Sequence, residues 1–139
     1  MKYAELEDLI ISALQPLLSE GVREIRPYAG ELTAEAAGSV AYRMPAVFVY
    51  ISEMRREAEL SNQAWHNYGI TLYIADRSLR RAGDASGCYW IAERIRELLL
   101  GKKIDGYSLA LSMERVLGVS IDTALMEAVY NLKMLIVEV

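Results

Sequence analysis

The sequence predicts one α+β domain over residues 1–139, with a mostly antiparallel sheet of about five strands packed by two main helices. Three observations support this prediction. Two stretches repeat apolar residues at steps of three and four, which is the period of an amphipathic helix. Two strand-like stretches, 46–52 and 65–76, follow each other without a helix between them, which favours antiparallel pairing. The length of 139 residues suits a single domain.

The first helix is predicted over Leu6–Leu18, where six apolar residues share one face. Gly21 follows as a typical helix end. Pro16 lies inside the pattern, and because proline lacks a backbone N–H and clashes with the preceding turn, the helix should be kinked or irregular there.

Two short elements are expected next. Val22–Tyr28 is a strand candidate, and Thr33 can cap a short helix between Gly30 and Arg43. Pro45 prevents that helix from continuing.

The centre of the chain predicts two strands of different character. Ala46–Ser52 is almost wholly apolar, as expected of a central strand covered on both faces. Trp65–Asp76 alternates between two faces. The polar segment Glu53–Ala64 between them is far longer than a tight hairpin turn requires, so it is predicted to be a loop that projects from the body.

The second half predicts a helix and two further strands. The helix begins at Cys88 after the polar connection Arg77–Gly87 and ends at Gly101. Leu109–Met113 alternates, and Val129–Val139 is expected to pair into the sheet as the last strand.

Composition excludes several classes of protein. No apolar run approaches the ~20 residues of a membrane-spanning helix. A net charge of −4 argues against general affinity for nucleic acid, which needs a concentrated surplus of basic residues. The single cysteine and the lack of a secretory signal predict a reducing, cytoplasmic environment.

The sequence offers no catalytic motif, so we expect no enzyme activity, no metal and no cofactor. His66 is the only histidine and is interpreted as an ordinary strand-end residue. Cys88 falls on the apolar stripe of its helix, which predicts a core position. Its place in the first helical turn is the one argument for a lowered thiol pKa.

Three arginines before the second long helix leave an alternative open. Arg77, Arg80 and Arg81 could bind an anion or nucleic acid at the helix start. A solvated loop balanced by Asp76 and Asp84 is the simpler interpretation, and contact with another subunit is a third.

Aromatic residues are more numerous than one small core requires. The chain has nine tyrosines and two tryptophans, and such residues are enriched at protein interfaces. Those at element ends or on second faces are Tyr28, Tyr42, Trp65, Tyr73, Tyr89 and Trp90.

Three segments carry a family resemblance: Tyr28–Leu32, Met44–Val49, and Ala75–Arg80 leading through Gly87 into the helix. In this order and spacing the chain resembles, over nearly its whole length, the Mu-like prophage tail protein family, typified by a tail-region protein of phage Mu. The resemblance implies a tail-terminator-like α+β fold. The chain departs from the family in its long Glu53–Ala64 segment and in a short connection after Lys103.

The same resemblance implies a tail terminator or tail completion protein. Such proteins form a ring, commonly a hexamer, which caps the finished tail tube and faces the head connector. The expected partners are therefore copies of the chain, tail tube and head-connector proteins, with no membrane and no specific nucleic acid. The expected location is the host cytoplasm during assembly and then the virion tail.

We expect the projecting segment and the strand beside it to contact the neighbouring subunit, because a ring needs a heterologous interface repeated about an axis. The predicted contact residues are Arg55, Arg56, Glu57, Glu59, Asn62, Trp65 and Tyr73.

Overall fold

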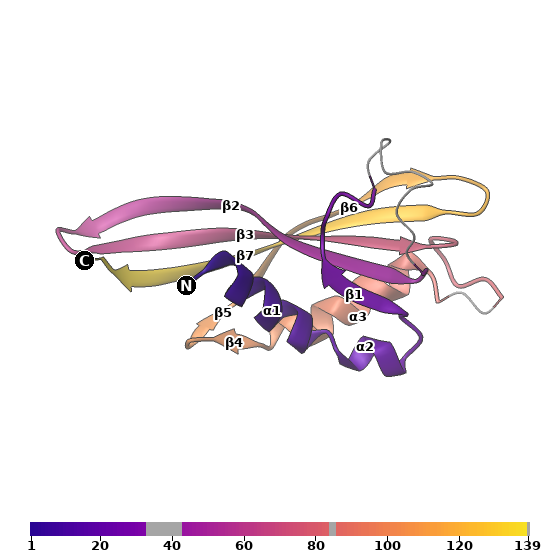
Figure 1. The fold of residues 1–139 in the computed structure, drawn as a ribbon, viewed down its shortest axis with the longest axis horizontal. Helices are drawn as coiled ribbons and strands as arrows, with labels where there is room; N and C mark the ends of the chain where they lie inside the picture. Colours follow the sequence, from indigo (N-terminus) through magenta and orange to yellow (C-terminus); the bar gives the residue numbers. More distant parts are fainter. Residues whose placement is uncertain (33–42, 84–85, 139) are drawn as a thin grey trace.

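A computed structural model describes residues 1–32, 43–83 and 86–138 (Figure 1). Its elements are α1 Tyr3–Ala13, α2 Pro16–Ser19, β1 Glu24–Pro27, β2 Ala46–Leu60, β3 Gln63–Asp76, α3 Cys88–Leu100, β4 Lys103–Ile104, β5 Tyr107–Ser108, β6 Ala110–Val119 and β7 Ala124–Val137. Five strands form one sheet in the order β1-β2-β3-β7-β6, and β4 and β5 form a small hairpin. Only the β1–β2 pair of the large sheet is parallel. The predicted α+β class is thus confirmed.

Proline interrupts the first helical segment as expected. α1 ends at Ala13, and a second helix begins with Pro16 in its first turn, where the missing N–H costs nothing. The short helix predicted to be capped by Thr33 lies outside the described residues.

The helices pack against one face of the sheet (Figure 1). Alternate residues of β3 and β7 point to this face and meet the apolar stripes of α1 and α3. Each fully buried leucine or isoleucine contributes roughly 1.5–3 kcal/mol relative to an exposed one. The fully buried members include Leu6, Ile10, Leu14, Leu17, Ile70, Leu72, Ile74, Ile91, Ile95 and Leu99.

The segment Glu53–Ala64 is not a loop, and that prediction is wrong. β2 continues to Leu60 and β3 begins at Gln63, so only Ser61 and Asn62 form the turn. The strands pair through their backbones while most of their side chains face solvent, which is why the segment lacks the apolar pattern of a buried strand.

β7 extends this ribbon on its other side. It begins at Ala124, earlier than the predicted Val129, and pairs with β3 from Asp76↔Ala124 to Gln63↔Val137. The predicted pairing of the C-terminal strand is confirmed. We call residues 53–60 of β2, 63–69 of β3 and 131–137 of β7 the arm. Figure 1 shows it extending past the helices at one end of the long axis.

Candidate interaction surfaces

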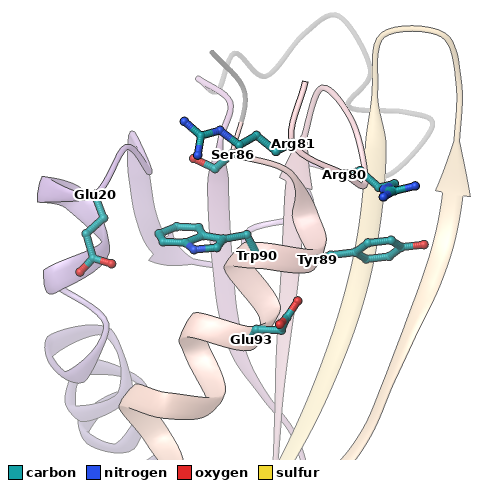
Figure 2. Close-up of a pocket in the computed structure, with 7 residues that line it drawn as sticks. All are labelled: Glu20, Arg80, Arg81, Ser86, Tyr89, Trp90 and Glu93. Carbon is teal, nitrogen blue, oxygen red and sulfur yellow. The ribbon is translucent and has the colours of Figure 1, made fainter. Parts of the chain in front are cut away.

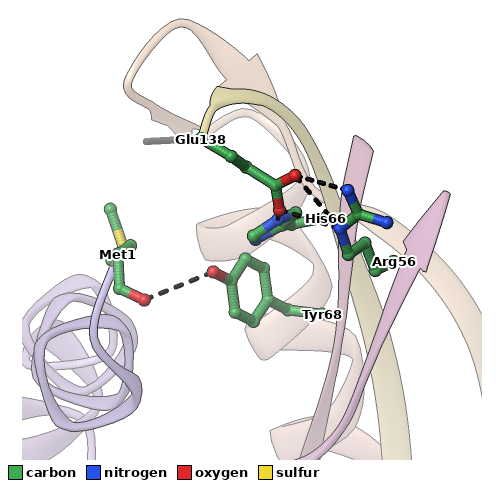
Figure 3. A network of polar contacts seen from close by, with 5 residues as sticks. All are labelled: Met1, Arg56, His66, Tyr68 and Glu138. Carbon is green, nitrogen blue, oxygen red and sulfur yellow. Dashed lines mark hydrogen bonds and ion pairs between the residues drawn. The ribbon is translucent and has the colours of Figure 1, made fainter. Parts of the chain in front are cut away.

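An ion-pair network joins the arm to the last described residue of the chain (Figure 3). The Glu138 carboxylate accepts hydrogen bonds from Arg56 Nε at 2.9 and 3.1 Å, and a 2.9 Å hydrogen bond joins it to His66 Nε2. These bonds, first Arg56 and then His66, lower the pKa of Glu138 to about 2. Nearby, the Tyr68 hydroxyl donates to the Met1 carbonyl at 3.2 Å. Met1 and Glu138 are thereby both tied to the arm.

The opposite face of the arm carries a second set of polar contacts. Trp65 Nε1 donates to Glu59 at 3.1 Å, and Lys133 Nζ lies 5.2 Å from the centre of the Trp65 ring. The same lysine pairs with Glu57 at 3.5 Å. The arm therefore holds its own side chains in place.

Two further predicted residues complete the arm. Arg55 pairs with Glu53 at 3.3 Å, and the Asn62 carbonyl accepts a hydrogen bond from the Glu138 N–H at 2.7 Å. Six of the seven predicted contact residues are thus brought together in this region. Sequence reasoning missed Lys133 and Glu138, which reach the arm from β7 only because that strand runs alongside β3.

Tyr73, the seventh predicted residue, belongs to a different place. It lies ten positions along β3 from Gln63, roughly 33 Å away along an extended strand. There it packs beside Tyr28 and Tyr50, and its hydroxyl lies 3.1 Å from that of Tyr50. Burial raises the pKa of the Tyr73 hydroxyl. Phe48 also touches Tyr28, so these rings form a compact aromatic cluster on the face away from the helices.

The arginine connection meets α3 in a groove of about 520 Å³ (Figure 2). Its lining residues are Glu20, Arg80, Arg81, Ser86, Tyr89, Trp90 and Glu93. Trp90 points toward Glu20, whereas Tyr89 and Arg80 lie on the other side of the helix. Arg77 is not among the lining residues, so the three arginines do not share one site.

Asp76 does not balance these arginines, contrary to the sequence interpretation. Its side chain is buried and accepts backbone hydrogen bonds from Arg77 at 2.7 Å and from Gly87 at 2.8 Å. These two hydrogen bonds hold the two ends of the Arg77–Gly87 connection together. Asp84, the other predicted partner, lies outside the described residues.

The start of α3 is occupied by the same connection. The N–H groups of Cys88 and Tyr89 donate to the carbonyls of Ser78 and Leu79 at 3.0 and 2.9 Å. Gly87 has a φ of +89°, and a Cβ there would lie 2.6 Å from the carbonyl carbon of Arg80. Two of the N–H groups that an anion would use are therefore already taken.

β6 forms an apolar edge of the sheet that sequence reasoning did not single out. Met113, Val116, Leu117 and Val119 are all exposed, and Ile121 in the following turn is fully exposed. Contiguous exposed apolar residues of this kind are typical of interaction sites. The signal in the sequence is the group of apolar residues around Gly118, which lies beyond the strand predicted over Leu109–Met113.

The two charged residues of β6 are paired within the chain. Glu114 accepts from Arg96 at 3.0 Å, and Arg115 donates to Glu127 at 2.9 Å. Lysine is the residue that most often protects an exposed edge, and β6 has none.

Cys88, one of the two residues considered for chemistry, is a core residue. Cys88 is fully buried with its Sγ 3.4 Å from the Ala124 carbonyl oxygen, and burial raises its pKa to about 12. The core position is confirmed and the suggested lowering of the thiol pKa is wrong. Within the described ranges, no three histidine, cysteine, aspartate or glutamate side chains gather as metal ligands would. None of the described helices is long and apolar enough to cross a membrane.

Comparison with known proteins gives one family. The family described as Bacteriophage Mu, Gp37 matches residues 2–133, which include every described helix and all of the large sheet except the end of β7. No curated protein matches the chain.

Proposed function

The chain belongs to the bacteriophage Mu Gp37 family, and from this premise we propose that this phage structural protein is a tail terminator or tail completion protein. It assembles as a ring, a hexamer in the expected form, at the end of the tail tube and contacts the head–tail connector. Its partners are copies of itself, tube proteins and connector proteins. Its action is binding, without catalysis.

The observation that carries this proposal is the arm. The arm extends past the helices, so it presents surface that the core of the chain does not use. Its charged side chains hold one another in place. The apolar β6 surface differs from it in chemistry. A ring uses two different patches on each subunit, one meeting the other on its neighbour, and this chain has two such patches.

Shortening the arm tests the proposal. Residues 58–64 can be replaced by an Asn-Gly turn that joins Glu57 to Trp65, which face each other across the ribbon. The body of the sheet keeps its core, so we expect a folded protein that no longer forms rings. Light scattering after size exclusion, alone and with purified tail tubes, measures the particle mass.

A matched control places the same turn outside the arm. Asp105 and Gly106 already have positive φ values in the β4–β5 hairpin, so Asp105→Asn creates an Asn-Gly turn there. This variant should assemble like the unaltered protein. Ring formation by the shortened protein would contradict the role of the arm. An unaltered protein that stays monomeric both alone and with tubes would contradict the proposed function.

One observation supports a second candidate, a module that binds anions or nucleic acid. The guanidinium groups of Arg77, Arg80 and Arg81 have no ion-pair partner among the described residues. The groove also contains Glu20 and Glu93, and the helix N–H groups beside it are occupied, so this candidate ranks second.

A further inference from the structure

Among the described residues, open edges lie on both sides of the large sheet, and residues 132–137 of β7, which β6 does not pair, form a short one. Two long edges lie on opposite sides. One is β6, Ala110–Val119. The other is β2 from Tyr50 to Leu60, because β1 pairs only with Ala46–Val49. Barrels remove such edges by joining them.

The backbone groups that face the β2 edge follow from the register. The Val49 carbonyl accepts from Tyr28 on the β1 side, so Val49 directs its backbone groups away from β3. Alternate residues of an antiparallel pair face alternate edges, and the pairing with β3 carries this alternation past the bulge at residue 52. Met54, Arg56 and Ala58 therefore direct their N–H groups outward.

The same reasoning fixes the outward groups of β6. Leu72 directs its backbone groups toward β7, so its partner Ala128 directs its own toward β3. Glu114, which lies opposite Ala128 in β6, therefore directs its backbone groups outward. The outward set is Leu111, Glu114, Val116 and Val119. Among the described residues, no backbone partner is found for these N–H groups or for those of Met54, Arg56 and Ala58. Ile51, nearest to β1, has its N–H held by Glu7 at 3.3 Å.

Strand directions allow the two edges to meet under rotational symmetry. β2 and β7 run one way, and β3 and β6 run the other. A rotation axis that runs roughly along the strands leaves their directions unchanged. The β6 strand of one copy therefore meets the β2 strand of the next as an antiparallel pair.

The stagger of the edges also suits a closed ring. Arg55 lies at the level of Asn67 in β3, whereas the middle of β6 lies at the level of Leu72 and Tyr73. The offset of five to six residues is roughly 17–20 Å along the strands, and four strands advance roughly 19 Å sideways. If the edges join with this offset, the strands are tilted by about 40–45° to the ring axis, which is close to the roughly 35–45° tilt of strands in barrels.

We propose that copies of this chain join by pairing the β6 edge of one with the open β2 edge of the next, so that the ring contains one continuous sheet. This inference rests on the proposed function, since it names the contact that builds the proposed ring. The exposed apolar side chains of β6 are then covered by the neighbouring arm.

Two proline variants test the pairing. Val116→Pro removes one outward N–H from β6, and Ala58→Pro removes one from β2, while the hydrogen bonds within the subunit remain. Each variant alone should be monomeric where the unaltered protein forms rings. Val116→Pro keeps its β2 edge and Ala58→Pro keeps its β6 edge, so an equimolar mixture should form a heterodimer of twice the chain mass.

Controls separate this inference from the proposed function. Lys2→Pro places proline where φ is −76°, away from both edges, and should form rings normally. Circular dichroism checks that the variants fold. If they do not, hydrogen exchange of the unaltered protein decides: the amides of Met54, Ala58 and Val116 should be protected in rings and exchange in diluted monomers.

Two kinds of experiment, on the proline variants and on hydrogen exchange, can overturn the edge pairing while leaving the proposed function intact. The contradicting results are a ring formed by either folded proline variant alone, a mixture that remains monomeric, or rapid exchange of these amides in rings. Failure of the unaltered protein to assemble, both alone and with tail tubes, would instead overturn the proposed function and this inference with it.

Discussion

The three strands of the arm, β2, β3 and β7, continue into the body of the five-stranded sheet, yet different forces hold the two regions. In the body, β3 places Ile70, Leu72 and Ile74 in a core from which water is excluded. In the arm, the same strand is held by backbone pairing and by contacts such as Arg56–Glu138 and Trp65–Glu59. Apolar burial supplies most of the free energy of folding, whereas exposed ion pairs contribute little.

This difference separates stability from recognition along one continuous strand. Because the body fixes the direction of β3, the arm can remain ordered although most of its β2 side chains are exposed. Its exposed residues are then free to change without loss of the fold. Substitutions in the body should consequently act on folding, and substitutions in the arm should act on assembly.

The largest loss of stability is expected in the body. Leu72→Ala removes a fully buried side chain between the helices and the sheet, and such changes lower the free energy of unfolding by about 2–5 kcal/mol. Urea denaturation followed by circular dichroism measures this loss. The comparison variant is Glu59→Ala on the arm, which should unfold nearly as the original protein does. Equal losses in the two variants would contradict the division between body and arm.

A smaller loss is expected at the end of the body where β3 leads into the arginine connection. Asp76→Ala removes the acceptor for the N–H groups of Arg77 and Gly87 and leaves a buried donor without a partner. An unsatisfied buried group costs about 1–3 kcal/mol. Urea denaturation again measures the loss, with Asp122→Ala on the exposed β6–β7 turn as control. A loss no larger than that of the control would show that Asp76 does not hold the connection.

The body could be predicted from the sequence because burial leaves a pattern. The apolar run Ala46–Ser52, the alternation after Trp65 and the stripe that begins at Cys88 each correspond to an element facing one core. Family membership and the broken helix at Pro16 were also within reach of the residues themselves.

The arm could not be predicted in the same way. Backbone pairing constrains side chains little where they face solvent, and nearly all of Glu53–Leu60 is exposed, so this part of β2 has the composition of a loop. The Glu138 contact depends on a register between β3 and β7 that is set by the core far from the arm. The edge position of β6 could not be predicted either, because a period of two does not reveal which strand lies at an edge.

The smallest effect on stability is expected in the arm itself, from Glu138→Gln. Hydrogen bonds from Arg56 and His66 hold the pKa of Glu138 near 2, below its ordinary value of 4.5. The ionised carboxylate therefore stabilises the folded state at any pH above 4.5, the ordinary pKa. This stabilisation is lost as the pH falls from 4.5 to the lower pKa that Glu138 has in the folded protein. Because the group is partly exposed, the gain is small and weakens with added salt.

The measurement is the difference in unfolding free energy between the original protein and Glu138→Gln across pH. The difference should be constant at neutral pH, shrink below about pH 4.5 and vanish near pH 2. Glu5→Gln, at an exposed glutamate in the first turn of α1, is the control for loss of a charge outside the network. A difference that grows as the pH falls would mean that Glu138 is not held as the carboxylate partner of Arg56. The arm would then be held by backbone pairing and by its other side-chain contacts, such as Trp65–Glu59 and Lys133–Glu57.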